Sequence, residues 1–198
     1  MKNTVKKILA SAASVLMLIL TSASAAEKVY KVGDIGPGGG IVFYKNVSGF
    51  SVEDGNGESK ICHYLEVSAE DLGQATWFPT SAVDMPSSKY GIGEGKAATN
   101  EILALVKKSD LTAENCAAYA CSKYRTSTTK AGDWFLPTSD EIRQLFKNLS
   151  PEKIHIENAE FYWSSSIEDN NKAWARKNKT STLDTIDNKF MVRAVHAF

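Results

Sequence analysis

The sequence has no long apolar run after its first residues, so nothing in its later length predicts a membrane span. The early run, residues 8–20, is about 13 residues long and falls short of the roughly 20 that a spanning helix needs. Lysines precede this run, and small residues at positions 21–25 follow it. That order is typical of a secretory signal peptide rather than of a membrane anchor. We predict a signal peptide over residues 1–25, cleaved after Ala25, and a protein that is secreted, periplasmic or on the cell surface.

An excess of charge is also missing. The 23 basic and 23 acidic residues balance, and removal of the three lysines of the leader leaves a net charge of −3. A slightly acidic domain is not a general polyanion binder, so nucleic acid is excluded as a partner and an anion site must be a local patch. Internal repeats and low-complexity linkers are absent, which favours one domain over residues 26–198.

Cysteine is scarce, with Cys62, Cys116 and Cys121 alone, and the three histidines are scattered along the chain. Without a paired C-x-x-C motif, this pattern predicts no zinc site and no other metal centre. An exported chain meets an oxidising compartment, which allows one disulfide and one remaining thiol. Cys116 and Cys121 lie five apart in an expected helix, too far apart for a comfortable bridge. If a disulfide forms, Cys62 is therefore one end of it.

Sequence motifs of enzymes are missing as well. The chain has no G-x-S-x-G elbow for a hydrolase. The stretch "GPGGGIVFY" leads into a strand, whereas a phosphate-binding loop opens a helix, so it predicts a turn. The stretch "GIGEGKAATNEIL" does open a helix, but it has Tyr90 at the first glycine of a Walker A motif and Ala97 in place of the hydroxyl. We predict no catalysis and no cofactor.

One local excess of positive charge stands out, in "KAWARKNK". Basic side chains around a tryptophan can pair with sulfates while a sugar ring stacks on the indole. A solvated hairpin would give the same pattern. The candidate ligand-binding residues are Lys172, Trp174, Arg176, Lys177 and Lys179, with Arg193 in support. The acidic stretch "IEDNN", residues 167–171, offers oxygen ligands for calcium, but an ordinary turn between strands is the commoner explanation.

The order of periodic segments predicts an α+β fold with largely antiparallel strands. The segments are strands at 29–32, 41–45, 61–67, 161–166, 172–177 and 189–198, and helices at 97–108, 113–123 (with Thr112 as its cap) and 139–149. Turn residues separate the early strands, and a polar loop covers 68–95. Strands therefore flank a central helical block, and we expect the first and last strands to meet.

The segment "DWFLPTSDEIRQLF" predicts a fixed junction between extended chain and helix. Trp134, Phe135 and Leu136 are apolar and extended, and the following proline disfavours helix before it. Thr138 and Glu141 have the spacing of a capping box. The helix beyond it shows one apolar face, formed by Ile142, Leu145, Phe146 and Leu149. We expect the segment to be structural, with its aromatic residues in the core.

Several motifs in order resemble the Lcl C-terminal domain family of bacterial collagen-like adhesins. They are "VGDIGPGGGIVFY", "YLEV", "GIGEGKAAT", "DWFLPTSDEIRQLF", "YWSSS", "AW" and "VRAVHAF", which together cover residues 30–198. The family is similar to C-type-lectin-like folds, including the formylglycine-generating enzyme group. The resemblance implies paired N- and C-terminal strands, two to three helices, and a second sheet that carries variable loops.

The resemblance also implies a function. Adhesins of this family bind sulfated glycans as trimers through basic surface residues. This chain departs from them in its slight acidity and in His196, where arginine is common. It contains no Glu-Pro-Asn or Gln-Pro-Asp triplet, so calcium chelation of the lectin type is not implied, and no cysteine after Cys121 could serve a formylglycine-generating reaction. The family usually has a cysteine at the position of Cys116, which implies that Cys62 and Cys121 are additions that bond to each other.

We therefore predict an exported, non-catalytic, adhesin-like binding module for an extracellular carbohydrate or polyanionic glycan. A protein-binding or structural envelope module without a small ligand is the alternative, and an enzyme of the formylglycine-generating kind is a third reading. The sequence leaves open whether the chain forms a homo-oligomer.

Overall fold

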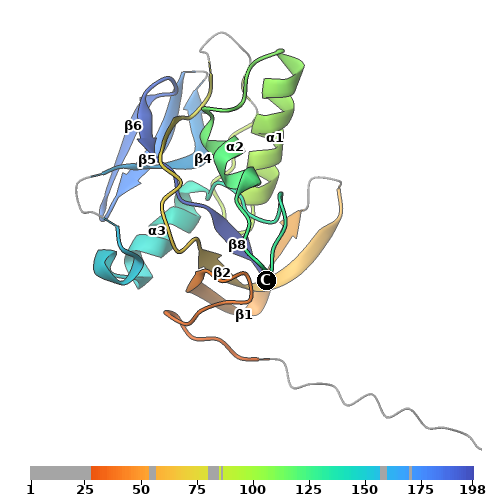
Figure 1. The fold of residues 1–198 in the computed structure, drawn as a ribbon, viewed down its shortest axis with the longest axis vertical. Coiled ribbons are helices and arrows are strands. Elements are labelled where there is room, and N and C mark those ends of the chain that lie inside the picture. The colour runs from red at the N-terminus through yellow and green to blue at the C-terminus, as the bar shows by residue number, and fades with distance from the viewer. Residues whose placement is uncertain (1–27, 54–56, 80–84, 86, 157–159, 170) are drawn as a thin grey trace, which may run out of the picture.

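A computed structural model describes residues 28–198, apart from 54–56, 80–84, 86, 157–159 and 170. The predicted signal peptide lies outside these residues. The elements follow one another as β1 (Ile41–Glu53), β2 (Ser59–Val67), β3 (Gln74–Thr76), α1 (Gly95–Lys108), α2 (Ala117–Lys123), α3 (Ser139–Asn148), a short 3-10 helix (Pro151–Ile154), β4 (Tyr162–Asp169), β5 (Lys172–Lys177), β6 (Thr180–Thr185), β7 (Lys189–Met191) and β8 (Val195–Ala197) (Figure 1).

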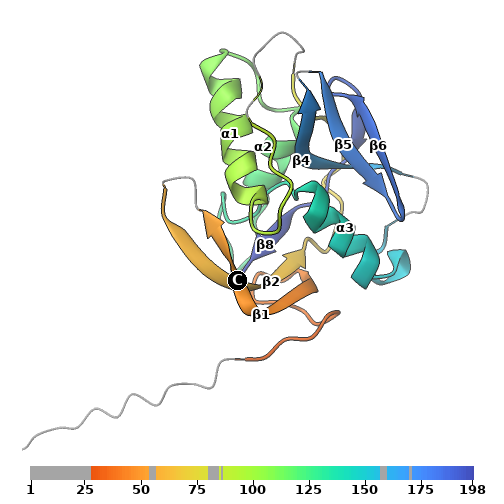
Figure 2. The same ribbon diagram turned by 180° about the vertical axis from the view of Figure 1, so that it is seen from behind.

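The strands form two sheets, and with the helices they confirm the predicted α+β class. The smaller sheet has the antiparallel order β1-β2-β8. The larger sheet has the order β3-β7-β4-β5-β6, in which only the β4–β7 pairing is parallel. The small sheet lies at one end of the domain and β4–β6 at the other, with α1 and α3 on opposite sides of β8 (Figures 1 and 2).

The predicted pairing of the two chain ends is wrong in detail. Residues 29–32 form no strand, because a turn closed between Lys31 and Asp34 begins there. The last strand, β8, pairs with β2 instead, so β2 separates it from β1. Side chains still join the ends: the ring centroid of Tyr30 lies 5.1 Å from that of Phe198 and 5.6 Å from that of Tyr64.

Three other predicted elements need correction. The strand expected at 189–198 is two short strands, β7 and β8, which belong to different sheets. The second helix begins at Ala117 with Cys116 at its N-cap, so Thr112 does not cap it. Strands β3 and β6 were not expected, since one is three residues long and the other is largely polar. The bounds of β5 agree with the prediction.

The segment before α3 joins the two hydrophobic clusters of the core. Trp134 and Leu136 pack in the cluster with α1 and α2, whereas Phe135 packs in the cluster beneath the small sheet. The backbone of Phe135 exchanges two hydrogen bonds of 2.9 Å with Val195 of β8. All three side chains before Pro137 are at most 1% exposed. The prediction that this segment belongs to the core is confirmed.

The capping box at the start of α3 is also confirmed, and its carboxylate has a second task. Thr138 Oγ1 accepts a hydrogen bond from Glu141 N (3.2 Å), and Glu141 Oε2 accepts one from Thr138 N (2.8 Å). Glu141 Oε1 accepts a third from Gly93 N (2.9 Å), in the turn that leads into α1. A Cβ on Gly95 would lie 2.3 Å from Glu141 Oε2, so glycine is needed for this close approach. One buried carboxylate therefore sets the starts of α1 and α3.

The predicted disulfide between Cys62 and Cys121 is not present in the structure. All three thiols are free and buried, and burial raises the pKa of each. Cys62 belongs to the cluster beneath the small sheet, and Cys121 belongs to the cluster with α1 and α2. The Cys116 thiol donates to the carbonyl oxygen of Trp77 at 3.1 Å. The cysteines therefore behave as small core residues.

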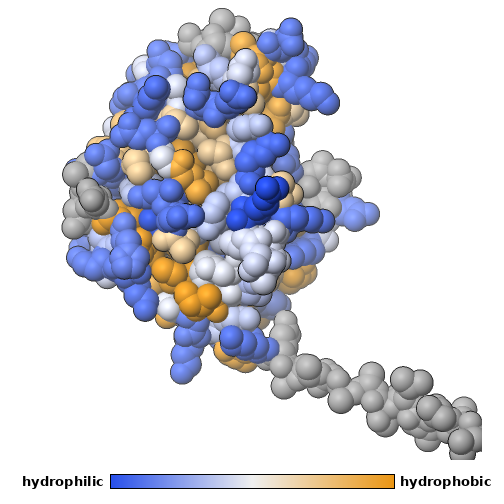
Figure 3. Space-filling model, in the orientation of Figure 1, coloured by the Kyte–Doolittle hydropathy of each residue, from blue (hydrophilic) through white to orange (hydrophobic). Residues whose placement is uncertain are grey.

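Within residues 28–198, the described part of the chain holds no helix that is both long and apolar enough to cross a bilayer. On the face shown in Figure 3, hydrophilic residues predominate and hydrophobic ones form small separate patches.

Replacement of Trp134 by alanine should lower the free energy of unfolding by about 3–5 kcal/mol, because it leaves a cavity in the cluster with α1 and α2 and removes the indole N–H bond to Thr129. Urea denaturation would measure this loss. Trp174→Ala, at a half-buried tryptophan, is the control and should cost clearly less. Equal costs for the two variants would contradict the assigned role of Trp134.

Glu141 predicts a pH dependence of stability. Burial raises its pKa from 4.5 to about 7, against the opposing effect of the N–H groups of Thr138, Gly93 and Gly95. The folded protein then binds this proton more tightly than the unfolded chain does, so its contribution is full below about pH 4.5 and is lost as the pH rises through 7. At about 1.4 kcal/mol per pKa unit, the loss is at most about 3–4 kcal/mol. Urea unfolding at pH 5 and pH 8 should show this fall, and Glu141→Gln should flatten it; an unchanged slope in the variant would refute the assignment.

Candidate functional site

The residues predicted to bind a ligand on β5 do not all share a surface. Strand alternation directs Ala173 and Ala175 to the core, and Trp174 and Arg176 to the opposite, half-buried face. Trp174 Nε1 donates to Glu168 at 3.1 Å, and Arg176 Nη1 donates to Ser181 Oγ at 2.8 Å. Both side chains are therefore already held by the protein.

The remaining basic residues of the predicted group lie apart from that face or at its end. Lys172 is exposed at the start of β5, and Lys179 is exposed in the turn before β6. Lys177 lies over the ring of Phe161, with its Nζ 5.7 Å from the ring centroid. The structure brings Trp174 and Arg176 together, and the predicted cluster is otherwise dispersed.

Arg193 is a structural residue and not part of a surface site. Its side chain is 1% exposed, and its Nε lies 2.5 Å from Asp71 Oδ1. Its Nη1 donates to the carbonyl oxygens of Ser68 (3.1 Å) and Ile154 (2.8 Å). A buried charge needs such partners, and together they fix the chain between β7 and β8. The prediction that Arg193 supports ligand binding is corrected.

Arg176 retains one feature of an anion site. Burial lowers the pKa of its guanidinium, and the charge of Arg143 on α3 lowers it further. Its Nε is buried and has no hydrogen-bond partner among the described residues. Arg143 is itself paired with Asp140, whose Oδ1 lies 2.8 Å from Arg143 Nη2.

A more enclosed candidate lies at the other end of the domain, around β8. It is a cavity of about 270 Å³ with an apolar part formed by Val52, Phe135 and Ala197. The polar lining comes from four parts of the chain: Glu58, Ser59 and Lys60 at the start of β2, Lys96 in α1, Asp133 before the core segment, and His196 in β8. The three residues from β2 are exposed and form the rim, whereas the other three are half-buried.

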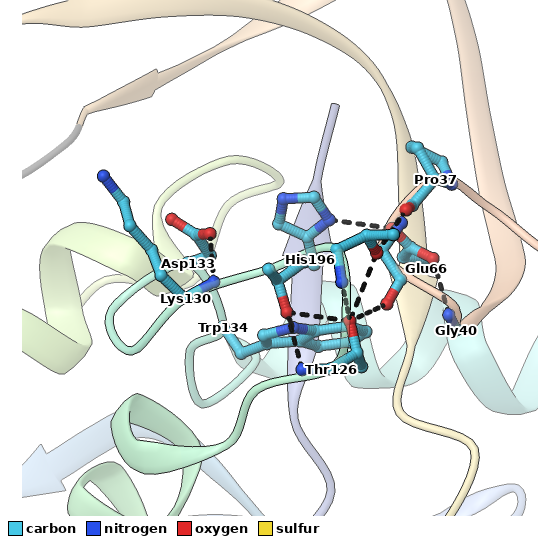
Figure 4. Close-up of polar contacts among 11 residues, drawn as sticks. Pro37, Gly40, Glu66, Thr126, Lys130, Asp133, Trp134 and His196 are labelled. Carbon is cyan, nitrogen blue, oxygen red and sulfur yellow. Dashed lines mark hydrogen bonds and ion pairs between the residues drawn. The ribbon is translucent and has the colours of Figure 1, made fainter.

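His196 is held in this cavity by a buried carboxylate. Glu66 of β2 lies opposite His196 in the strand register, and its Oε1 is 2.7 Å from His196 Nδ1 (Figure 4). Glu66 is fully buried. The ring of Trp134 lies beside the imidazole, with the centroids 5.4 Å apart. Because Nδ1 faces Glu66, Nε2 is the ring nitrogen left for a ligand.

The glycine-rich loop is built around the same carboxylate. Gly38 N and Gly40 N each donate to Glu66 at 2.8 Å. A Cβ on Gly36 or Gly38 would lie 2.5 Å from a Glu66 oxygen, so neither position has room for a side chain. The hydroxyl of Thr126 donates to Gly38 O and holds the far side of the loop (Figure 4). The stretch is a turn, as predicted, and the anion that it binds is the chain's own glutamate.

Apart from His196, the ionisable side chains of the cavity lining form no ion pair in the described part of the chain. Among the described residues, Glu58, Lys60 and Lys96 take part in no ion pair, while Asp133 accepts only from Lys130 N, at 2.8 Å. Burial raises the pKa of the nearby Cys62 thiol, and the charges of Lys60 and Lys96 both oppose this rise. The lining as a whole carries charges of both signs.

A metal centre has no support in the described residues, where no group of three His, Cys, Asp or Glu side chains could hold an ion. In the stretch considered for calcium, Glu168 accepts from Trp174 Nε1 and from the hydroxyl of Tyr90. Residue 170 of that stretch lies outside the described part of the chain.

No protein-family model matches the chain, and no curated protein matches it. Among solved structures, the chain is similar to a fimbrial protein from Bacteroides ovatus, with a TM-score of 0.54 and 14% sequence identity. The match covers 82% of this chain and 45% of the fimbrial protein, so the chain spans less than half of that protein's length. At this identity the similarity shows a shared fold.

Replacement of Glu66 by glutamine tests the carboxylate that supports this site. The amide nitrogen would face an N–H donor of the loop or His196, and a buried unsatisfied donor costs about 1–3 kcal/mol. Chemical denaturation should show that loss. Glu58→Gln, at an exposed glutamate near the same strand, should change stability by no more than about 0.5 kcal/mol. If Glu66→Gln and Glu58→Gln had the same stability, the glycine-rich loop would not depend on the Glu66 carboxylate.

Proposed function

We propose that the chain is a non-catalytic, adhesin-like binding module of an exported protein, and that it recognises an extracellular carbohydrate in the cavity at His196. One observation carries this proposal: a small cavity is lined by charged side chains of both signs that form no ion pair with any residue the structure describes. Its volume of about 270 Å³ lies near the lower end of the roughly 300–1,000 Å³ typical of ligand pockets. That size suits one sugar residue of a longer glycan.

The chemistry of the lining favours a carbohydrate. Sugar hydroxyls both donate and accept hydrogen bonds, and the cavity offers carboxylate acceptors, ammonium donors and an imidazole. Glu66 fixes the orientation of the imidazole, so its contact with a ligand is prearranged. Preorganised polar groups lose little freedom when they bind, which favours affinity.

The arrangement gives no support to catalysis. Among the described residues, the only hydrogen-bond partner of His196 is Glu66, so no hydroxyl or thiol is positioned for activation by the imidazole. Burial raises the pKa of all three thiols and keeps them in the unreactive protonated form. These features favour a binding module over an enzyme of the formylglycine-generating kind.

Three considerations support a role at the cell surface. The first residues have the pattern of a signal peptide. The ordered motifs resemble the Lcl C-terminal domain family of bacterial adhesins. The fold is similar to that of a fimbrial protein, although the chain spans only 45% of it.

A second surface, the β5 face, is the candidate for a polyanionic glycan. The observation in its favour is that Arg176 Nε is buried and has no hydrogen-bond partner among the described residues. Trp174 on the same face offers a ring for stacking.

A glycan array without calcium tests the proposed function. We expect the protein to bind a subset of glycans, and Ser59→Trp to lose that binding because its indole would fill the exposed rim of the cavity. Thr180→Trp, at an exposed position on β6, is the matched control and should bind as the wild type does. An array on which the wild type binds no glycan would refute the carbohydrate proposal. Equal binding by both variants would refute the cavity as the site.

A further inference from the structure

We infer that the sugar residue held in the cavity at His196 carries one carboxylate group, which pairs with Lys60 and Lys96 while the hydroxyls of the ring contact Asp133 and His196. This inference rests on the proposed function and names the class of its ligand, an acidic sugar of the uronic type.

The two lysines form the anion-binding part of the cavity. They come from different elements, β2 and α1, and line the same space. The cavity is small, about 270 Å³, so a ligand inside it lies within reach of both side chains. Neither has an ion pair with a described residue. A carboxylate between them would relieve their mutual repulsion and gain charge-assisted hydrogen bonds.

The position of Lys96 in its helix also supports an anionic ligand. It lies in the first turn of α1, which contains no acidic residue. A positive charge there opposes the helix dipole, so Lys96 does not stabilise α1. The turn before α1 is fixed by Glu141, which accepts from Gly93 N. Lys96 is half-buried at an unfavourable end of a helix and forms no ion pair with a described residue, so it suits a ligand that supplies an anion.

The acidic residues limit how much negative charge the ligand carries. Glu58 and Asp133 balance Lys60 and Lys96, so the lining carries no large net charge. A polysulfated chain would meet these two carboxylates at close range and be repelled. A residue with a single acid group avoids this repulsion, and its hydroxyls can donate to Asp133. Asp133 and His196 both line the cavity, so hydroxyls of one sugar ring can reach them.

NMR titration of the protein at low ionic strength tests the inference, with D-glucuronate, D-glucose and D-glucose 6-sulfate as probes. We expect glucuronate to shift the amide signals of Lys60, Lys96 and Asp133 and to bind at least about tenfold more tightly than glucose, as loss of a charge-assisted bond implies. The sulfate should bind no more tightly than glucuronate. The inference would be overturned if glucose bound as tightly as glucuronate, or if glucose 6-sulfate bound more tightly. It would also be overturned if the changes in amide signals were confined to other parts of the chain.

Variants of the two lysines separate the cavity from general attraction of anions. Lys96→Gln, at the half-buried lysine, should weaken glucuronate binding about tenfold, and Lys60→Gln, at the exposed one, by up to about fivefold. Lys108→Gln, at the exposed end of the same helix, is the matched control and should bind normally. Equal weakening in all three variants would overturn the inference.

The two proposals can fail separately. Binding of neutral glycans on the array, blocked by Ser59→Trp, together with no preference for glucuronate, would refute the acidic sugar and leave the binding module standing.

Discussion

The candidate site depends on one buried carboxylate, that of Glu66. Removing a carboxylate from water is costly unless hydrogen bonds replace its hydration, and three donors do so here: Gly38 N, Gly40 N and His196. These donors come from the start and the end of the domain, so a single side chain on β2 joins the glycine-rich loop to β8. Glu141 has a comparable role for α1 and α3. Glu66 thus orients the imidazole of His196, and Glu141 fixes the turn before the helix that carries Lys96. Both His196 and Lys96 line the cavity.

Much of the fold could be predicted from local patterns. The helix after Pro137 has a capping box and an apolar face, and both depend on residues within two turns of each other. The core positions of Trp134–Leu136 follow from three large apolar side chains in succession. The order of the strands in the sheets could not be predicted in the same way. The pairing of β8 with β2 depends on contacts between residues far apart in the sequence. Strand β6 has too few apolar side chains for its alternation to be recognised.

The site was harder to predict because its residues meet only in three dimensions. Glu66 and His196 are 130 positions apart, and Arg193 and Asp71 are 122 apart. The sequence did contain a signal in each case, a charged residue inside an apolar stretch: Glu66 in "YLEV" and Arg193 in "VRAV". Such residues are buried only when they are paired. The basic stretch on β5 is more conspicuous in the sequence, but the structure places its predicted ligand-binding residues on different surfaces.

The account is tested most directly by a crystal structure of the protein grown with D-glucuronate. It predicts the sugar in the cavity at His196, with its carboxylate within hydrogen-bonding distance of the Nζ atoms of Lys60 and Lys96 and a ring hydroxyl on Asp133. A sugar bound on the β5 face beside Trp174 and Arg176, with the cavity empty, would contradict it.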